Sequence, residues 1–221
     1  MAARKKKGAH PNLSAEKVRA TALRLIEEDG LDELSTRKLG RALGVEAMAI
    51  YWYYPSKEAL LDAVVDLLIT KMDPRAMEVE GEWIDALRRL AHAYRALAHE
   101  YPKAFPLLAT RRFATPGTFG FLERLFGVAR EQGLDDKTTA RWFRLVASYC
   151  SGVALDELAG QKEADAGGPP EEIKNQFPRL VAVSGFLAPN HFDEVFEFGL
   201  GVLFDGLEAE VEKRAAKRKN R

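Results

Sequence analysis

Apolar residues recur at helical spacing along almost the whole chain, and this period restricts the possible folds more than any other feature. After Ser14, for example, Val18, Ala22, Leu25 and Ile26 fall on one side of a helix. Almost no segment alternates apolar and polar residues, as a half-buried strand would. The sequence therefore predicts an all-α protein.

Serine, glycine and proline residues indicate where these helices begin and end. Ser14, Ser35 and Ser56 are suited to N-caps, whereas Gly30 and Gly44 are suited to the residue that follows a helix. A helix over 171–183 should kink or split, because it contains a proline. The expected helices span 14–29, 35–43, 46–53, 56–73, 83–99, 102–109, 116–132, 136–162, 171–183 and 190 into the basic C-terminus.

A charged loop between residues 74 and 81 is the expected boundary between two domains. We predict an N-terminal three-helix domain and a larger helical domain, bridged by the helix over 56–73. The expected division is a basic flexible tail at 1–13, a small domain at 14–61, a large domain at 62–212 and a basic tail at 213–221.

Composition indicates a soluble, cytoplasmic protein. With 47% hydrophobic residues the 221-residue chain has enough apolar side chains for a core. The basic start is followed by no apolar stretch, and no apolar run approaches the roughly 20 residues that span a bilayer. The only cysteine, Cys150, has no partner within the chain, which suits a reducing compartment, and we interpret it as a core residue.

The formal net charge is zero, but basic residues are concentrated at both ends. Arg4, Lys5, Lys6 and Lys7 lie at the start, and six more lysines and arginines lie between 213 and 221. Such tails bind nucleic acid in some proteins and only increase solubility in others, so both interpretations stay open.

The segment from Thr36 to Tyr51 contains the pattern of a helix-turn-helix. Gly40 allows two short helices to approach, and Gly44 allows the sharp turn between them. The second helix of such a motif enters the major groove of DNA. Expected base contacts are Glu46, Ala47 and Met48, and expected phosphate contacts are Thr36, Arg37, Tyr51, Tyr53 and Lys57.

The stretches Leu34–Glu46 and Ile50–Leu61 resemble the DNA-binding domain of the TetR family of bacterial regulators. The resemblance covers roughly residues 14–61. It implies phosphate contacts by Thr36, Tyr51 and Lys57, and it places Tyr53 where the family often has a histidine.

Residues 80–83, 109–111, 197–201 and 206–208 resemble the ligand-binding domain of tetracycline-sensing members of this family. A magnesium-binding histidine of those proteins is replaced here by Pro106 or Leu107, and a pocket amide by Leu90, which argues against magnesium–tetracycline sensing. We expect no metal, no cofactor and a small, largely apolar effector. The candidate pocket walls, any of which could instead be plain core, are Leu90, Tyr94, Phe105, Leu108, Phe113, Trp142, Val146 and Tyr149.

The last helix is apolar on two sides, one through Phe196 and Leu203 and another through Phe198 and Val202. A helix with two apolar sides must be covered on both. We therefore expect a homodimer in which this helix and the helix over 136–162 form a four-helix bundle with the partner.

The expected function is a repressor that leaves a palindromic double-stranded operator when the effector binds. The sequence contains no catalytic motif, and His92 and His99 on one helix are too far apart for one metal, so we do not expect an enzyme. The alternatives are a helical partner-binding protein without specific DNA recognition, and an activator in place of a repressor.

Overall fold

The computed structural model describes residues 13–111, 116–165 and 175–219. The described residues form helices and connecting turns only, which confirms the all-α class. The chain divides into two compact units. The first comprises the chain up to Pro74 together with 100–122, and the second comprises 75–99 and 123–221.

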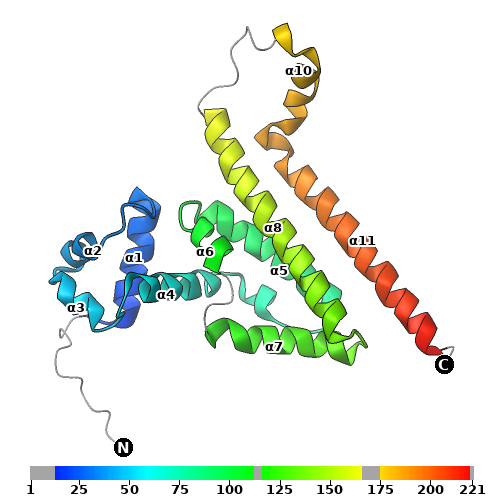
Figure 1. The fold of residues 1–221 in the computed structure, drawn as a ribbon, viewed down its shortest axis with the longest axis horizontal. Coiled ribbons are helices and arrows are strands. Elements are labelled where there is room, and N and C mark those ends of the chain that lie inside the picture. Colours follow the sequence, from blue (N-terminus) through cyan, green and yellow to red (C-terminus); the bar gives the residue numbers. More distant parts are fainter. Residues whose placement is uncertain (1–12, 112–115, 166–174, 220–221) are drawn as a thin grey trace, which may run out of the picture. The chain divides into compact units, whose positions relative to one another are not determined.

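The N-terminal helices of the first unit form a three-helix head extended by a fourth helix (Figure 1). The serines expected as caps accept hydrogen bonds from backbone N–H groups at the helix starts, at 3.0 to 3.2 Å. Gly30 and Gly44 follow helices with φ of 98° and 68°, which favour glycine. The helices are α1 (Ala15–Asp29), α2 (Thr36–Leu43), α3 (Ala47–Tyr51) and α4 (Lys57–Ile69).

The core of this head consists of the apolar residues that the helical period selects. Val18, Ile26, Leu39, Ile50 and Val64 are buried, and they come from all four helices. Burying each such side chain stabilises the fold by about 1.5–3 kcal/mol relative to leaving it in water.

A short helix from later in the chain, α6 (Phe105–Arg111), belongs to the same unit and packs against α4. Arg111 bonds Asp62 of α4 at 2.9 Å. On α1, the Glu27 carboxylate accepts the backbone N–H of Ala104 at 2.7 Å, and Lys103 Nζ donates to the carbonyl of Glu28 at 2.7 Å. The start and the end of α6 are thus joined to two helices of the head.

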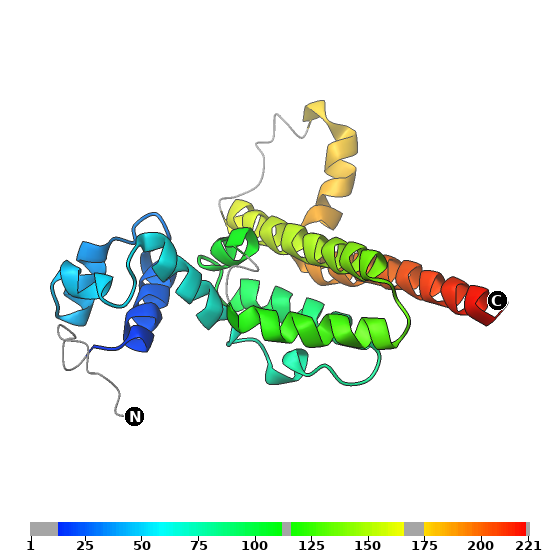
Figure 2. The same cartoon turned by 60° about the horizontal axis from the view of Figure 1, so that its bottom comes forward.

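In the second unit, α8 (Asp136–Asp165) and α11 (Phe192–Lys219) lie side by side in both ribbon views (Figures 1 and 2). This unit also contains most of α5 (Trp83–Glu100) and most of α7 (Pro116–Glu131). Short elements complete it: η1 (Pro74–Met77), α10 (Pro178–Ser184), η2 (Gly185–Leu187) and η3 (Pro189–His191).

Several helix boundaries differ from the sequence-based prediction, and three of them are instructive. α4 ends at Ile69 and not at residue 73, because the backbone then tightens into turns in which the N–H groups of Lys71 and Met72 donate to carbonyls three residues earlier, at 2.9 and 3.2 Å. α6 begins at Phe105 and not at 102, because the residues before it form a turn held by Glu27. Pro178 starts α10, where its fixed φ suits a first helical turn.

Some expectations lie outside the described residues. These are the basic N-terminal tail before Leu13, Phe113, and most of the glycine- and proline-rich loop at 164–170. At the other end of the chain, α11 continues through the basic segment as far as Lys219.

Candidate nucleic-acid interface and effector domain

Two glycines bring α2 and α3 close together. A Cβ placed on Gly40 would lie 2.8 Å from the carbonyl oxygen of Val45 and 3.2 Å from the backbone nitrogen of Ala47. Both neighbours are backbone atoms, so a larger residue at 40 would push α3 away. Together with the left-handed backbone of Gly44, this contact fixes the angle of the turn. The helix-turn-helix predicted from the sequence is present.

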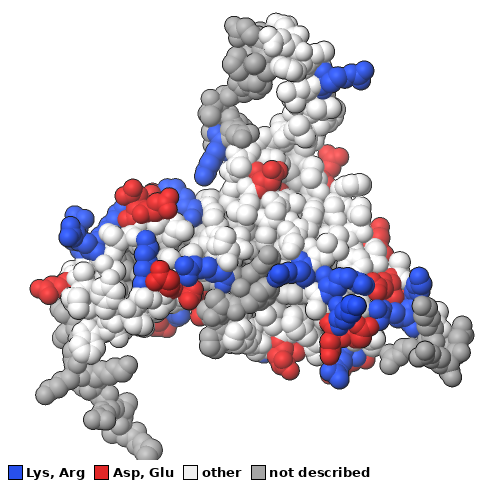
Figure 3. All heavy atoms as spheres, viewed as in Figure 1, with Lys and Arg blue, Asp and Glu red and all other residues white. Residues whose placement is uncertain are grey.

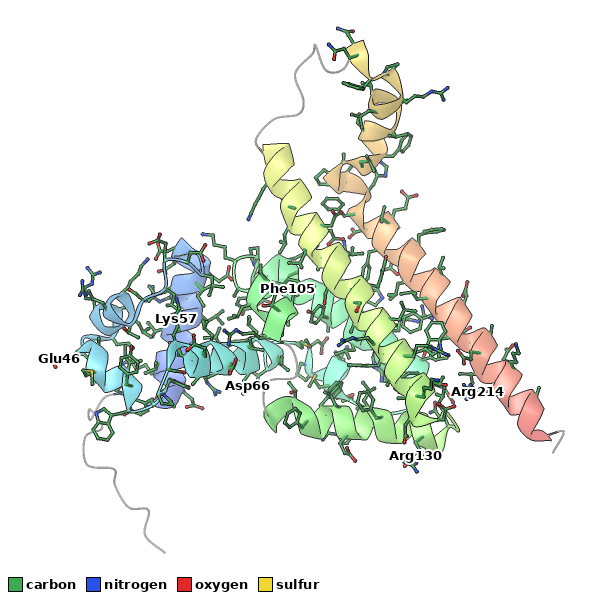
Figure 4. All side chains as sticks on the ribbon, in the orientation of Figure 1. Glu46, Lys57, Asp66, Phe105, Arg130 and Arg214 are labelled. Carbon is green, nitrogen blue, oxygen red and sulfur yellow. The ribbon has the colours of Figure 1, made fainter. Side chains whose placement is uncertain are left out.

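One side of α3 faces solvent and presents both an acidic and an apolar side chain. Glu46, at the N-cap of α3, is exposed, and Met48 is 67% exposed. Figure 4 shows Glu46 at the outer end of the head. Ile50 is 1% exposed and anchors the opposite side of α3 in the core. An exposed apolar thioether beside a carboxylate is able to touch a thymine methyl group and a cytosine amine.

A hollow of about 630 Å³ lies between α2 and α3. Two of its lining residues, Arg41 and Trp52, are exposed and are not among the DNA contacts predicted from the sequence. The helical period gives the signal that would have found Arg41, because it lies on the side of α2 away from the buried Leu39. The other residues lining the hollow are Gly40, Gly44, Val45, Glu46, Met48 and Ala49.

The aromatic run at 51–54 divides into two pairs. Tyr51 and Trp52 are 40% and 57% exposed. Tyr53 instead donates its hydroxyl to the carbonyl of Leu13 at 2.7 Å, and Tyr54 donates to the carbonyl of Ala15 at 2.9 Å. Since a phenol has one proton to donate, the structure gives Tyr53 a partner other than the expected phosphate. Both hydroxyls hold the chain where it enters α1.

The remaining expected phosphate contacts lie at helix starts. Thr36 and Arg37 begin α2, and Lys57 begins α4. Arg37 and Lys57 are exposed, and Figure 4 labels Lys57. Helix N-termini present backbone N–H groups that favour anions. Lys38, which we did not predict as a contact, pairs with Asp29 at 2.9 Å and so joins α2 to the end of α1.

Two of the candidate pocket walls pack against α11. The Trp142 indole donates to Glu210 at 2.8 Å, and a Cβ on Gly206 would lie 3.1 Å from the same ring. The Tyr149 hydroxyl donates to the carbonyl of Phe196 at 2.9 Å, over Gly199. Glycines on α11 thus make room for two aromatic rings of α8. Trp142 and Tyr149 therefore hold these two helices together, and their place among the effector walls stays a prediction.

The other candidate walls are divided between the units. Phe105 and Leu108 on α6 are buried in the first unit. Leu90 and Tyr94 on α5 are half-buried in the second unit. Val146 on α8 is buried there as well, whereas Phe113 lies outside the described residues. Tyr94 Oη lies 3.1 Å from Ser151 Oγ, so this wall contains a polar pair.

The sequence analysis did not predict one buried carboxylate in the second unit. Glu157 is 3% exposed and bonds Arg95 at 3.0 Å and His99 at 2.8 Å. Arg95 also bonds Asp193 at 2.7 Å. Burial favours a lower pKa for Arg95, but its bonds to Glu157 and Asp193 raise the pKa overall. This cluster ties α5, α8 and α11 together, and the four-residue spacing of Arg95 and His99 was its only signal.

An apolar surface remains uncovered on the side of α11 that faces away from its own core. Phe198 is 75% exposed, and Val195 and Val202 are also exposed. Leu145 and Leu155 on the neighbouring α8 are exposed as well. Their counterparts on the other side, Phe196 and Phe204, are fully buried. Large apolar patches on soluble proteins commonly mark protein interfaces.

Comparison with protein families identifies both parts of the chain. Residues 18–64 match the model "Bacterial regulatory proteins, tetR family", and residues 76–211 match "Tetracyclin repressor-like, C-terminal domain". The chain belongs to the TetR family. It is a regulator with a DNA-binding helix-turn-helix and is not an enzyme.

Individual TetR-family proteins match along most of their length. The chain is 30% identical to the tetracycline repressor protein class G of Vibrio anguillarum, over 86% of this chain and 90% of the relative. A possible TetR-family regulator of Streptomyces coelicolor A3(2) is 33% identical with a TM-score of 0.74, covering 89% of this chain and 99% of that one. A TetR variant of Acinetobacter baumannii AYE, in complex with minocycline, is 28% identical with a TM-score of 0.71, covering 90% and 98%.

Proposed function

We propose that this chain represses transcription by binding a palindromic operator as a homodimer, and that a small, largely apolar effector releases it. The observation that supports this most strongly is the exposed side of α3, held by Gly40 at a fixed angle to α2. The match to a tetracycline repressor supports repression over activation of transcription. None of the described helices is both long and apolar enough to cross a membrane, and the proposal places the protein in the cytoplasm with its DNA.

In the proposed complex, α3 lies in the major groove. Glu46 and Met48 contact base edges, joined by Arg41, whose guanidinium suits the acceptor pair of a guanine. Ala47 is half-buried behind them and permits close approach. Thr36, Arg37, Tyr51 and Lys57 contact phosphates, which position the helix without reading sequence.

The apolar surface of α8 and α11 supports a dimer through a four-helix bundle. A two-fold dimer brings the same surface of each chain together, so Phe198 and Val202 would be covered by their own counterparts. The α3 helices of the two chains, about 34–36 Å apart, can then enter successive major grooves on one side of the DNA.

The effector site is proposed in the domain that follows the helix-turn-helix, with Leu90, Tyr94 and Val146 among its walls. A relative of the same family has been solved with minocycline, which supports a small ring-containing ligand in this class of protein. The replacement of a magnesium-binding histidine by Pro106 or Leu107 still argues for a ligand bound without metal.

The first test is selection of duplexes from a random DNA library by the purified protein, at about 50 mM and about 200 mM salt. The proposal predicts an enriched palindrome, bound about 10³–10⁵-fold more weakly at the higher salt if six to ten phosphates are contacted. A folded protein that enriches no sequence would support the alternative of a partner-binding protein. A reporter placed behind the enriched operator distinguishes a repressor, which lowers expression, from an activator.

A further inference from the structure

Four long side chains line the hollow between α2 and α3. Arg41 comes from α2, Glu46 is the N-cap of α3, and Met48 and Trp52 come from α3 and its C-cap. All four are exposed, Met48 to 67% and Trp52 to 57%. Because Trp52 keeps helical φ and ψ, it lies one turn after Met48 on the same side of the helix. The hollow therefore presents one cation, one carboxylate and two large apolar side chains.

The other residues that line the hollow are short: Gly40, Gly44, Val45 and Ala49. A Cβ at Gly40 would meet the carbonyl oxygen of Val45 at 2.8 Å, so the backbones of the two helices approach closely here. Where no long side chain covers the backbone, a ligand can approach it closely. The four long side chains therefore decide what the hollow can bind.

The two charged side chains of the hollow are available to a partner. In the described part of the chain, neither Arg41 nor Glu46 forms a side-chain hydrogen bond or ion pair, whereas Lys38 on the same α2 pairs with Asp29. On the face of the head seen in Figure 3, acidic and basic side chains are interspersed. Selective binding by the head then depends on how individual side chains are placed, and less on a uniformly basic face.

Each kind of side chain in the hollow matches one group in the major groove of DNA. A guanidinium donates to O6 and N7 of guanine, a carboxylate accepts the N4 amine of cytosine, and apolar side chains contact a methyl group at C5 of a pyrimidine. Thymine would place its O4 acceptor against the Glu46 carboxylate, so this residue favours cytosine. A cytosine methylated at C5 and followed by guanine gives all four side chains a partner.

We propose that this hollow binds the major-groove edge of a cytosine–guanine step in each operator half-site, and that a methyl group at C5 of the cytosine strengthens binding. Arg41 recognises the guanine and Glu46 recognises the cytosine. Met48 and Trp52 cover the C5 position and so detect the methyl group. The inference depends on the proposed DNA-binding function, and it adds the sequence step and its regulation by base methylation.

The first experiment asks whether the step is present and which residues recognise it. Wild type, Arg41→Gln and Glu46→Gln each select duplexes from the random library, and wild type should enrich a cytosine–guanine step in both half-sites. Arg41→Gln should lose about 5- to 150-fold of the preference for guanine, as expected for one bidentate base contact. Glu46→Gln gains an amide donor that suits the O4 of thymine, so it should accept thymine in place of the cytosine.

The second experiment measures the effect of methylation on the selected operator. Affinities are compared for two duplexes that differ only in a methyl group at C5 of the cytosine in this step. Methylation should strengthen wild-type binding about fourfold for each half-site, the factor that follows from removing one methyl group from water. Methylation of cytosines outside the step is the control and should leave the affinity unchanged.

Substitutions of Trp52 connect the methyl effect to the hollow. Trp52→Ala should remove most of the effect, and Trp52→Phe should keep part of it, because phenylalanine retains an apolar ring. The neighbouring Tyr51 is also exposed but lies outside the hollow, so Tyr51→Ala is the matched control. It should weaken binding to both duplexes by the same factor. The ratio of the two affinities is measured within each variant, so a loss of folded protein cancels.

A wild type that enriches a palindrome without a cytosine–guanine step would overturn this inference and leave the repressor intact. An affinity that methylation leaves unchanged or lowers would do the same. A methyl effect that persists undiminished in both Trp52→Ala and Met48→Ala would overturn the role of these two side chains. A folded wild type that enriches no sequence would overturn the proposed function as well, so the failures are distinguishable.

Discussion

The carboxylate of Glu27 on α1 accepts the backbone N–H of Ala104, 2.7 Å away, in the residue that precedes α6. Ala104 is fully buried, and Glu27 also lies 3.4 Å from the backbone nitrogen of Lys103. A side chain of the first helix thus satisfies backbone donors at the start of a helix nearly 80 positions later.

Glu27→Ala should therefore destabilise the first unit. The substitution leaves the buried N–H of Ala104 without its acceptor, which costs about 1–3 kcal/mol. Urea unfolding monitored through tryptophan fluorescence measures the difference. Glu33→Ala, at an exposed position before α2, is the control and should change stability by less than about 0.5 kcal/mol. Equal unfolding midpoints for the two variants would contradict this role of Glu27.

Gly40→Ala should weaken both folding and DNA binding. The added methyl group would meet the carbonyl of Val45 at 2.8 Å, and overpacking against backbone costs about 1–3 kcal/mol. Because α3 must shift, operator affinity should fall by more than the loss of folded protein explains. Gly127→Ala in α7 is the matched control, since no atom lies within 4 Å of its added Cβ. It should stabilise the protein by about 0.5–1 kcal/mol, and a loss of stability there would contradict the reasoning.

The contact between the end of α11 and the start of α8 should weaken in acid. Thr138 and Arg214 bond Asp135 and lower its pKa, and Trp142, Arg141 and Arg214 lower the pKa of Glu210. A carboxyl whose pKa is lower in the folded state stabilises that state above its unfolded pKa, near 4, and loses this contribution as the pH falls through the folded value.

The thermal midpoint of wild type should accordingly fall more steeply between about pH 5 and about pH 3 than that of Glu210→Gln. The exposed control Glu212→Gln should follow wild type. A Glu210→Gln curve parallel to that of wild type would show that Glu210 contributes nothing to the acid dependence.

Phe198→Glu should separate the proposed dimer. The Phe198 side chain is 75% exposed in one chain, and a charge there would be buried between two copies without a partner. Sedimentation at micromolar concentration should give twice 24.6 kDa for wild type and 24.6 kDa for the variant. Asp205→Asn on the same helix should remain dimeric. A monomeric wild type would contradict the interface.

The helical period and the caps were sufficient to predict the head. Ser14, Ser35 and Ser56 cap helices as expected, and Gly44 has the left-handed backbone that the turn requires. These features act over a few residues, so they are readable from a single sequence. Arg41 could have been added from its place on α2 opposite Leu39.

Contacts between distant segments could not be predicted in the same way. Nothing local to Tyr53 indicates that its hydroxyl meets the carbonyl of Leu13, 40 positions earlier. Trp142 and Tyr149 look like pocket walls by residue type, but Gly206 and Gly199 on α11 give them space to pack. The partners of Glu157 on α8, Arg95 and His99, lie on α5 about 60 positions earlier, so no local pattern around Glu157 indicates them.

The proposed role of the exposed side of α3 in base recognition is tested most directly by repeating the DNA selection with Met48→Ala, Glu46→Ala and Tyr51→Ala. If α3 reads base edges through its exposed side, Met48→Ala and Glu46→Ala will each change the preferred base at one or two symmetric positions of the palindrome. Tyr51→Ala will keep the same preferred sequence and bind every duplex more weakly. Identical preferred sequences for all three variants and wild type would contradict the assignment of α3 as the reading helix.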